Sequence, residues 1–385
     1  MTGRLKEAAR ARAEESRGGL VDLSHRIHAN PELGLEEHRS SQWVAEALAE
    51  GGLEVEAGIH GLPTAFVAKV GSGPLHVAIC AEYDALPDIG HACGHNVIAA
   101  AAVGAGLALA GIADEAGLTV SVFGTPAEES HGGKITLIEG GAFDGVHAAM
   151  MVHPAPFEAM EFPIIAAATM EVRYTGKAAH ASAFPEQGVN AADALTVAQV
   201  AIGLLRQHLR QTDRVHGIVT HGGDAPNVVP AHTGATFMVR ATTLDEMKEV
   251  HAKVRRCFEA GALATGATLE ITERPPYAEM RADPDMLAIY RRNAEAAGRS
   301  FPELPEALRR AAASTDMGNV SHVVPSIHPA MGLDSLPAVN HQPEFTAYCA
   351  SAEADRAVFD GAVIMAWTAI DMAADERVRE RLTAS

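Results

Sequence analysis

The chain has 385 residues, of which 48% are hydrophobic and 21% charged, and its formal net charge at pH 7 is −19. This composition is typical of a globular protein long enough for two domains, and it argues against a disordered chain. The negative charge argues against a nucleic-acid partner, because phosphate binding needs a basic surface. The four cysteines are widely spaced and form no CxxC pair, so we expect no disulfide framework and a cytoplasmic protein.

The first third of the chain alternates helical and strand patterns. Residues 1–17 are rich in charge and alanine and predict an exposed helix, and apolar residues have helical spacing in 20–28 and 40–51. The run 97–113 is mostly Ala and Gly and is shorter than the ~20 residues that span a bilayer, so it predicts a helix packed in a core rather than a membrane span. The predicted strands are 64–70, 75–80, 118–123 and 147–152. Such alternation predicts an α/β fold with a mostly parallel sheet sandwiched by helices.

From about residue 168 the pattern changes to strand, helix, strand, strand, helix, strand. This order is typical of the ferredoxin-like α+β arrangement. The elements are predicted at 169–174, 190–209, 217–221, 233–241, 244–263 and 268–273. The remainder returns to helices and short strands, so we expect one domain of residues 1–167 and 281–385, with a second domain, 168–280, inserted into it.

The run His91-Ala92-Cys93-Gly94-His95-Asn96 places three metal-binding side chains at alternate positions. Alternate residues of an extended segment point to the same side, so the three could converge. Thiolate and imidazole suit zinc and similar metals. A metal site also needs carboxylates and further histidines from elsewhere in the chain.

Carboxylates follow two of the predicted strands. Glu82 and Asp84 come after strand 75–80, at the end where ligands bind in open α/β sheets, although a solvated turn is an equal reading. Glu128 and Glu129 come after strand 118–123, and neighbouring side chains point in different directions. One of this pair can therefore bind a metal while the other acts as general base. The alternative is an acidic pair at a helix N-terminus.

Three histidines lie next to a proline or in a loop, where a side chain can reach a metal or a substrate. His153 precedes Pro154, His341 lies near the C-terminus, and His180 lies in a loop near the start of the proposed inserted domain. The chain has 19 histidines, so each of these positions could arise by chance.

Together these residues resemble the M20 metallopeptidase family, in its aminoacylase-like amidohydrolase branch. Within that branch the chain is most similar to the subgroup of M20 domain-containing protein 2 and the aminobenzoyl-glutamate hydrolases. The resemblance runs from about residue 22 to 372, and the motifs keep the family's order. The matching strings are Glu82-Tyr83-Asp84-Ala85-Leu86-Pro87, His91 to Asn96, Gly124-Thr125-Pro126-Ala127-Glu128-Glu129, Ala179-His180-Ala181, Pro226-Asn227-Val228-Val229-Pro230, Ser314-Thr315-Asp316-Met317-Gly318 and Asn340-His341.

The resemblance implies two divalent metal ions, with Zn²⁺ favoured and Mn²⁺ or Co²⁺ as alternatives, and Cys93 bridging them. It implies a catalytic domain that binds the metals and an inserted lid domain that forms a homodimer. The implied metal ligands are Cys93, His95, Glu129, His153 and His341. The implied catalytic residues are Glu128 as general base and His180 as an oxyanion donor, usually from the partner subunit, and the implied substrate-binding residues are Asn227 and Arg240.

The chain departs from the branch's usual pattern at two places. Asn96 stands where Asp is common, and Cys80-Ala81-Glu82 replaces Arg-x-Asp. On this assignment His91 is not a ligand, and the roles of Glu82, Asp84 and His91 stay open.

The resemblance implies hydrolysis of the amide bond of N-acyl amino acids or short dipeptides by a metal-activated water. Three alternatives remain: other amides or carbamates as substrates, a non-catalytic metal-binding dimer, and nucleophilic catalysis by Cys93. The expected partners are a small-molecule substrate and a second copy of the chain, with neither nucleic acid nor membrane.

Overall fold

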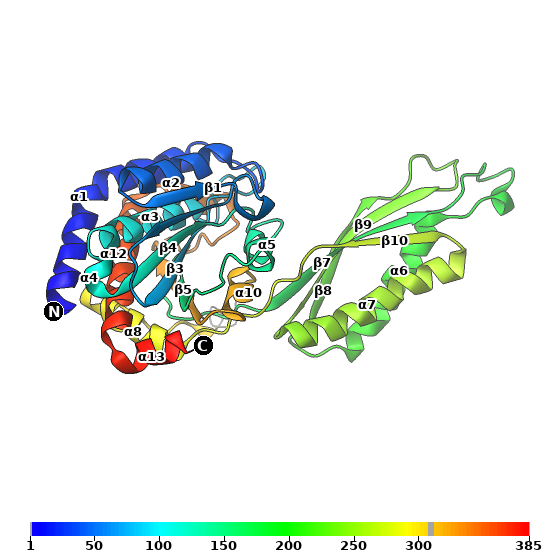
Figure 1. Ribbon diagram of the computed structural model, residues 1–385. Helices are drawn as coiled ribbons and strands as arrows, with labels where there is room; N and C mark the ends of the chain where they lie inside the picture. The colour runs from blue at the N-terminus through cyan, green and yellow to red at the C-terminus, as the bar shows by residue number, and fades with distance from the viewer. Residues whose placement is uncertain (1, 307–311, 385) are drawn as a thin grey trace. The chain divides into compact units, whose positions relative to one another are not determined.

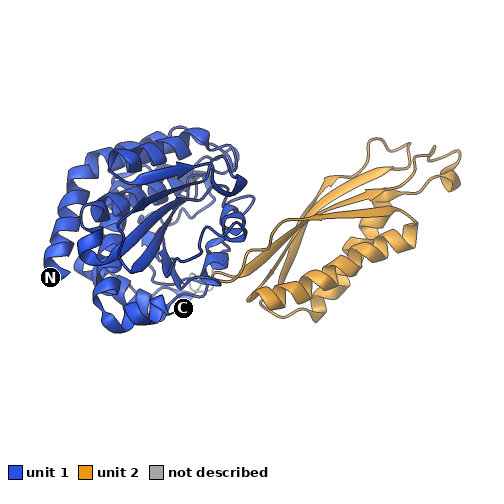
Figure 2. Cartoon of the chain, viewed as in Figure 1, with its two compact units in different colours: residues 1–163, 280–385 blue, residues 164–279 orange. Residues whose placement is uncertain are grey.

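The computed structural model describes residues 2–306 and 312–384, which form two compact units (Figure 2). Unit 1 contains the residues up to 163 and those from 280 onward, and unit 2 contains residues 164–279. The chain therefore leaves unit 1, completes unit 2, and returns to finish unit 1.

Unit 1 is built on a six-stranded sheet in the order β1-β2-β4-β3-β5-β11 (Figure 1). β3 pairs in parallel with β4 and β5, and β11 pairs in parallel with β5, while β2 runs antiparallel to β1 and β4. The mostly parallel sheet is therefore confirmed. The strands are β1 Glu54–Ala57, β2 Phe66–Val70, β3 Leu75–Ala81, β4 Leu118–Gly124, β5 Ala148–Met150 and β11 Ser326–Ile327. A separate parallel pair is formed by β6 His153–Ala155 and β12 Ala330–Gly332.

Helices cover both faces of this sheet, as the side chains of β3 show. Val77 and Ile79 belong to the core beneath α1, α3 and α12, whereas Ala78 and Cys80 face the opposite core with α5 and α10. The helices of unit 1 are α1 Thr2–His28, α2 His38–Glu50, η1 Ile59–Gly61, α3 His95–Ala110, α4 Ala113–Ala116, α5 Gly133–Glu139, α8 Pro284–Ala296, α10 Met317–Ser321, α11 Pro343–Tyr348, α12 Ala352–Ala374 and α13 Glu376–Thr383.

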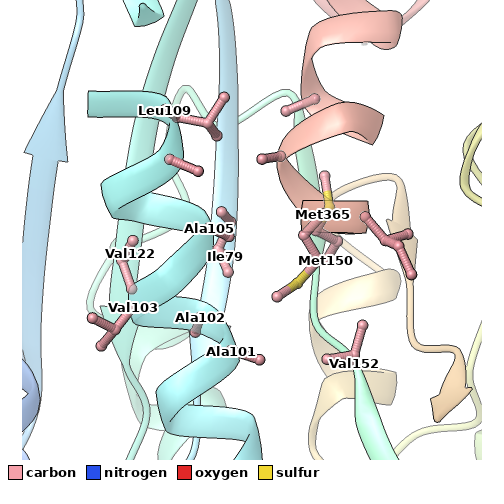
Figure 3. Packing of buried hydrophobic residues seen from close by; sticks show 14 of the residues in the cluster. Ile79, Ala101, Ala102, Val103, Ala105, Leu109, Val122, Met150, Val152 and Met365 are labelled. Carbon is pink, nitrogen blue, oxygen red and sulfur yellow. The ribbon is translucent and has the colours of Figure 1, made fainter. Parts of the chain in front are cut away.

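The centre of unit 1 is the close packing of α3 against α12 and the sheet (Figure 3). Small residues allow this approach, since a Cβ at Gly104 would lie 2.6 Å from Ala362 Cβ. Among the described residues, α12 is the one helix long and apolar enough to cross a bilayer, but 83% of its apolar window is buried inside the unit. It is the core helix of unit 1, and α3 is packed in the core as predicted.

The first helix differs from its prediction. α1 runs unbroken from Thr2 to His28, and Leu5, Ala9 and Ala13 are buried at a spacing of four residues. The expectation of an exposed helix over residues 1–17 was wrong for this face. The many charged residues lie on the other positions of the helix and obscured the short apolar stripe.

Unit 2 has one antiparallel sheet in the order β10-β7-β9-β8, with α6 and α7 packed together against it (Figure 1). Its chain order, β7-α6-β8-β9-α7-β10, is the ferredoxin-like order predicted from the sequence. The elements are β7 Ala166–Thr175, η2 Pro185–Gln187, α6 Ala191–Leu205, η3 Arg206–His208, β8 Arg214–His221, β9 His232–Ala241, α7 Leu244–Thr265 and β10 Thr268–Glu273.

Candidate metal centre

The site lies where neighbouring segments of unit 1 end. Glu82 and Asp84 follow β3, and Glu128 and Glu129 follow β4, its parallel neighbour. Carboxyl ends of parallel strands meet at one edge of a sheet, so the four carboxylates lie on the same side. Three further segments complete the set. Cys93 and His95 lie at the start of α3, His153 begins β6, and His341 lies in the loop before α11.

Three backbone positions with positive φ shape these loops. Gly94 has φ 80°, and a Cβ there would lie 2.8 Å from Pro154 Cβ, so glycine lets the loop approach β6. Ala127 has φ 58° and His341 has φ 66°, values that are uncommon for residues with side chains. Such strain tends to be kept where structure serves function.

Five side chains form two groups of three donor atoms. One group is Cys93, His95 and His153, the other is Cys93, Glu129 and His341, and within each group all the donor atoms lie within 4.8 Å of one another. Cys93 Sγ is 3.5 Å from His153 Nε2, and His341 Nε2 is 3.2 Å from Glu129 Oε1. Cys93 belongs to both groups, as a bridging thiolate would. The structure therefore brings together all five ligands implied by the resemblance.

The imidazole rings of His95 and His153 are each oriented by a hydrogen bond at Nδ1. His95 Nδ1 lies 2.9 Å from Asp84 Oδ1, and Asp84 Oδ2 accepts a hydrogen bond from the Glu129 backbone N–H at 2.9 Å. His153 Nδ1 donates to the Pro154 carbonyl at 2.8 Å. Because Nδ1 is engaged in each case, Nε2 is directed toward the other ligands, which is the usual arrangement of metal-binding histidines.

Unpartnered buried atoms show that the cluster fits cations. His95 Nε2 and Glu82 Oε2 are fully buried and face each other at 3.4 Å, yet neither forms a hydrogen bond to another described residue. Buried polar atoms are normally satisfied, and leaving a buried charge without a partner is costly. Thiolate, imidazole and carboxylate donors together suit a borderline divalent metal such as zinc.

The adjacent glutamates have opposite electrostatic surroundings. Burial and the carboxylates of Glu82 and Glu129 raise the pKa of Glu128 well above its usual value. Burial also raises the pKa of Glu129, but hydrogen bonding by His341 and the imidazole of His95 outweigh it and lower that pKa to about 2. Two carboxyls whose pKa values are pushed apart are suited to different roles, Glu129 as ligand and Glu128 as proton carrier.

Cys93 is a poor candidate for a nucleophile. Burial and the carboxylate of Glu129 raise the pKa of its thiol well above the usual value. Only a thiolate attacks or binds metal, so the thiol needs a cation in place of its proton.

His91 lies outside both ligand groups. It is 1% exposed, and neither of its ring nitrogens is hydrogen-bonded within the described chain. Its ring stacks on His28 at 6.3 Å between centroids, and burial with the neighbouring His95 lowers its pKa to about 3. His91 is therefore a buried, neutral imidazole that belongs to neither ligand group.

In unit 2 the structure brings His180 and Asn227 together but places Arg240 elsewhere. His180 forms a β-bridge with Val228, and the Ala181 N–H donates to the Asn227 carbonyl at 3.1 Å. Arg240 instead pairs with Ala167, at the opposite end of β9 from these loops. A strand rises roughly 3.3 Å per residue, so on the order of 25 Å separates the two ends. Within one chain, Arg240 and Asn227 cannot hold the same small molecule.

His180 is poised as a donor. The backbone N–H groups of Ser182 and Ala183 donate to its Nδ1 at 3.3 and 3.2 Å. Because Nδ1 accepts hydrogen bonds, the proton of the neutral ring lies on Nε2.

Comparison with known proteins identifies the family. Residues 166–265 match the peptidase dimerisation domain of the M20 peptidases. The Xaa-Arg dipeptidase of Mus musculus is 40% identical to this chain, over 96% of the chain and 89% of that protein. The chain belongs to the M20 peptidase family. As an M20 enzyme it is an amidohydrolase.

Other relatives and solved structures agree. One of the subunits of the p-aminobenzoyl-glutamate hydrolase of Escherichia coli K12 is 33% identical, over 67% of this chain and 58% of that protein. The structure of Bacillus subtilis YXEP, titled a dinuclear metal binding peptidase from the M20 family, matches with a TM-score of 0.70 at 21% identity, over 94% of this chain and 99% of that chain. A putative aminohydrolase of Staphylococcus aureus matches with a TM-score of 0.76 at 21% identity, over 95% and 99%. These two structures show that this chain has the M20 fold.

Several residues around this M20 site were missed by sequence reasoning. Asn340 donates to the Pro154 carbonyl at 3.0 Å, and Glu37 accepts from the Ala127 N–H at 2.8 Å. Lys134 and Asp316 form a buried ion pair with Glu82. His328 is buried beside His153, with 5.2 Å between ring centroids. Asn340 and Asp316 belong to motifs that carry the family resemblance. Glu37, Lys134 and His328 carried no sequence signal.

Proposed function

We propose that this M20 amidohydrolase cleaves dipeptides with a C-terminal arginine or another basic residue, with Glu128 as general base. Its wider class of substrates, N-acyl amino acids and short dipeptides, follows from the family. The observation that carries the proposal is a buried carboxyl, Glu128, beside two three-atom ligand groups that share Cys93. The finer substrate class is supported by the mouse relative, named an Xaa-Arg dipeptidase, and by the net charge of −19, which attracts cations.

The side chains divide the work. Cys93, His95, Glu129, His153 and His341 would hold two ions, which when bound supply Lewis-acid activation of a water molecule and of the amide carbonyl. Glu128 takes the proton of the attacking water and passes it to the leaving amine. His180 donates a hydrogen bond from its Nε2–H to the carbonyl oxygen of the amide, where negative charge develops as the water attacks.

We further propose a zinc-dependent, cytoplasmic homodimer with unit 2 as its dimerisation domain. Zinc is supported by the thiolate and imidazole donors. A reducing compartment is supported by four buried, free cysteines, all within the described residues. The dimer is supported by the match of residues 166–265 to a dimerisation domain and by exposed apolar side chains on β8 and α6.

A substrate panel tests the proposal. Zinc-loaded protein is incubated with Xaa-Arg, Xaa-Lys and Xaa-Asp dipeptides, N-acetyl amino acids, aminobenzoyl-glutamate and an N-carbamoyl amino acid, and amine release is measured. We expect kcat/KM to be highest for the basic dipeptides, with kcat lower by about 10²–10⁴-fold in Glu128→Gln. Preference for acidic or acetylated substrates would overturn the basic-dipeptide proposal, and preference for the N-carbamoyl compound would favour a carbamoylase.

A further inference from the structure

A buried ammonium group lies beside the metal centre. Lys134 Nζ donates to Glu82 Oε1 at 2.5 Å and to Asp316 Oδ1 at 2.6 Å, and all three side chains are fully buried. Lysine is almost never fully buried unless it is paired. Two carboxylates surround one ammonium, so the triad keeps one negative charge that its own members do not neutralise.

The uncompensated charge lies on the Glu82 side. Asp316 uses both oxygens on Lys134, with Oδ1 on Nζ and Oδ2 accepting from the backbone N–H at 2.9 Å. Glu82 uses only Oε1 in this way. Its Oε2 has no hydrogen-bond partner in the described part of the chain and faces His95 Nε2 at 3.4 Å. The remaining charge is therefore directed at a proposed metal ligand.

The backbone fixes the lysine in place. α5 begins at Gly133, where a Cβ would lie 2.0 Å from the Pro126 carbonyl oxygen. Glycine thus lets α5 lie directly against the loop that carries Glu128. Asp316 immediately precedes α10, and its carboxylate accepts hydrogen bonds from both the backbone N–H and the ammonium of Lys134. The ammonium therefore has little freedom to move away from Glu82.

His95 lies between two sets of donors. Its Nε2 belongs to the group with Cys93 and His153, and also to a group with carboxylate oxygens of Glu82 and Glu128, again with all atoms within 4.8 Å. Zinc takes four ligands, and the first group offers three. Glu82 Oε2 is a buried carboxylate oxygen with no hydrogen-bond partner among the described residues, and it faces His95 Nε2.

We propose that Glu82, held in position by Lys134 and Asp316, is a sixth protein ligand of the centre and binds the same ion as His95. The inference rests on the proposed metal centre. It gives Lys134 the role of a positioning residue, which aims one glutamate oxygen at the ion by holding the other.

Metal binding to Glu82→Gln tests the inference. The variant leaves Lys134 paired with Asp316, so the buried charges balance and the fold should be kept. We expect the affinity for one of two zinc ions, measured by chelator competition, to fall at least about tenfold. Glu82→Asp, which keeps the charge but withdraws the oxygen by one methylene, should show a similar loss. The matched control is Glu158→Gln, which removes a buried carboxylate paired with Arg299 at 3.2 Å and should leave zinc affinity unchanged.

Glu129→Ala, measured in parallel, separates this inference from the proposed function. If Glu129→Ala loses an ion and both Glu82 variants bind two ions as tightly as the wild type, Glu82 is not a ligand. If Glu129→Ala also binds both ions unchanged, the metal centre itself is wrongly assigned.

Discussion

Glu128 and Glu129 are neighbours in the chain, but their removal should have different effects. Glu128→Gln keeps the shape of the side chain and removes the base, so kcat should fall by about 10²–10⁴-fold with both ions retained. Glu129→Ala removes a donor atom of the Cys93 and His341 group, so an ion should be lost. Steady-state kinetics and metal analysis of each purified variant check this. Wild-type kcat in Glu128→Gln would contradict the assignment of the base.

Glu37 is a buried carboxyl that holds the loop leading to Glu128. Its Oε1 accepts from the N–H of Ala127, the positive-φ residue before Glu128, and its Oε2 accepts from the Thr64 hydroxyl at 3.0 Å. Burial, and then the charge of Asp84, raise the pKa of Glu37 to about 7. The folded state therefore binds this proton more tightly than the unfolded state, in which the pKa is near 4.5.

This shift makes the stability of metal-free protein fall as pH rises from about 4.5 to about 7. Below that window Glu37 is protonated in both states, whereas above it the folded state must hold a buried charge. Glu37→Gln has no proton to lose. Its stability relative to the wild type should therefore increase between pH 5 and 8, by about 2–3 kcal/mol at most. Urea unfolding at the two pH values measures this difference, and an unchanged difference would mean that Glu37 is ionised throughout.

The residues that sequence reasoning found and missed differ in kind. Cys93 and Glu128 stand in short, ordered motifs, so local pattern and family resemblance identified them together. Lys134 pairs with Asp316 across 182 positions, and its surroundings, Gly-Gly-Lys, resemble any loop that enters a helix. No periodicity records which distant carboxylate a lysine meets. That pairing depends on how α5 and α10 pack on the sheet.

At the scale of elements, the predicted strands and helices succeeded where burial is uniform. β3, β4 and α3 are mostly apolar and almost entirely buried, and their segments were located to within a few residues. α1 was misread because its apolar stripe is narrow. β1 was missed because its four residues, Glu54–Ala57, are mostly exposed and carry two glutamates, which leaves no apolar pattern.

The junction between the Cys93 loop and α3 has little room for an added methyl group. Gly94→Ala forces a side chain into φ 80° and against Pro154 Cβ and Cγ, both 2.8 Å from the new Cβ. We expect a loss of about 1–3 kcal/mol in unfolding free energy and weaker zinc binding, because Cys93 and His153 are pushed apart. Gly52→Ala is the matched control. It has φ 92° and a Cβ that would meet nothing within 4 Å in the described residues, so it should lower stability without changing zinc affinity. Equal zinc affinity in the two variants would show that the Pro154 contact does not position the ligands.

At the scale of the whole molecule, unit 2 exposes apolar side chains of the kind that are usually buried at protein–protein interfaces. β8 is an edge strand of its sheet, with Ile218 67% exposed, and Val200 and Leu204 on α6 are 60% and 64% exposed. An edge strand presents unpaired backbone groups that a second copy can bind. The distance between Arg240 and His180 within one chain gives a catalytic reason for pairing: a site that uses both needs His180 from another subunit.

Mixing two inactive variants distinguishes an active site built from two subunits from one built within a single chain. Glu128→Gln lacks the base but keeps His180, and His180→Ala has the reverse defect. If each site takes Glu128 from one chain and His180 from its partner, a mixed dimer contains one site with both residues intact. After unfolding and refolding an equal mixture, half of the dimers are mixed, so activity should return to about a quarter of the wild-type value. If His180 serves the site of its own chain, every site in the mixture lacks one residue and activity stays at the level of the separate variants. Size-exclusion chromatography of the refolded mixture verifies that dimers re-formed, so that a lack of recovery counts against the shared site rather than against refolding.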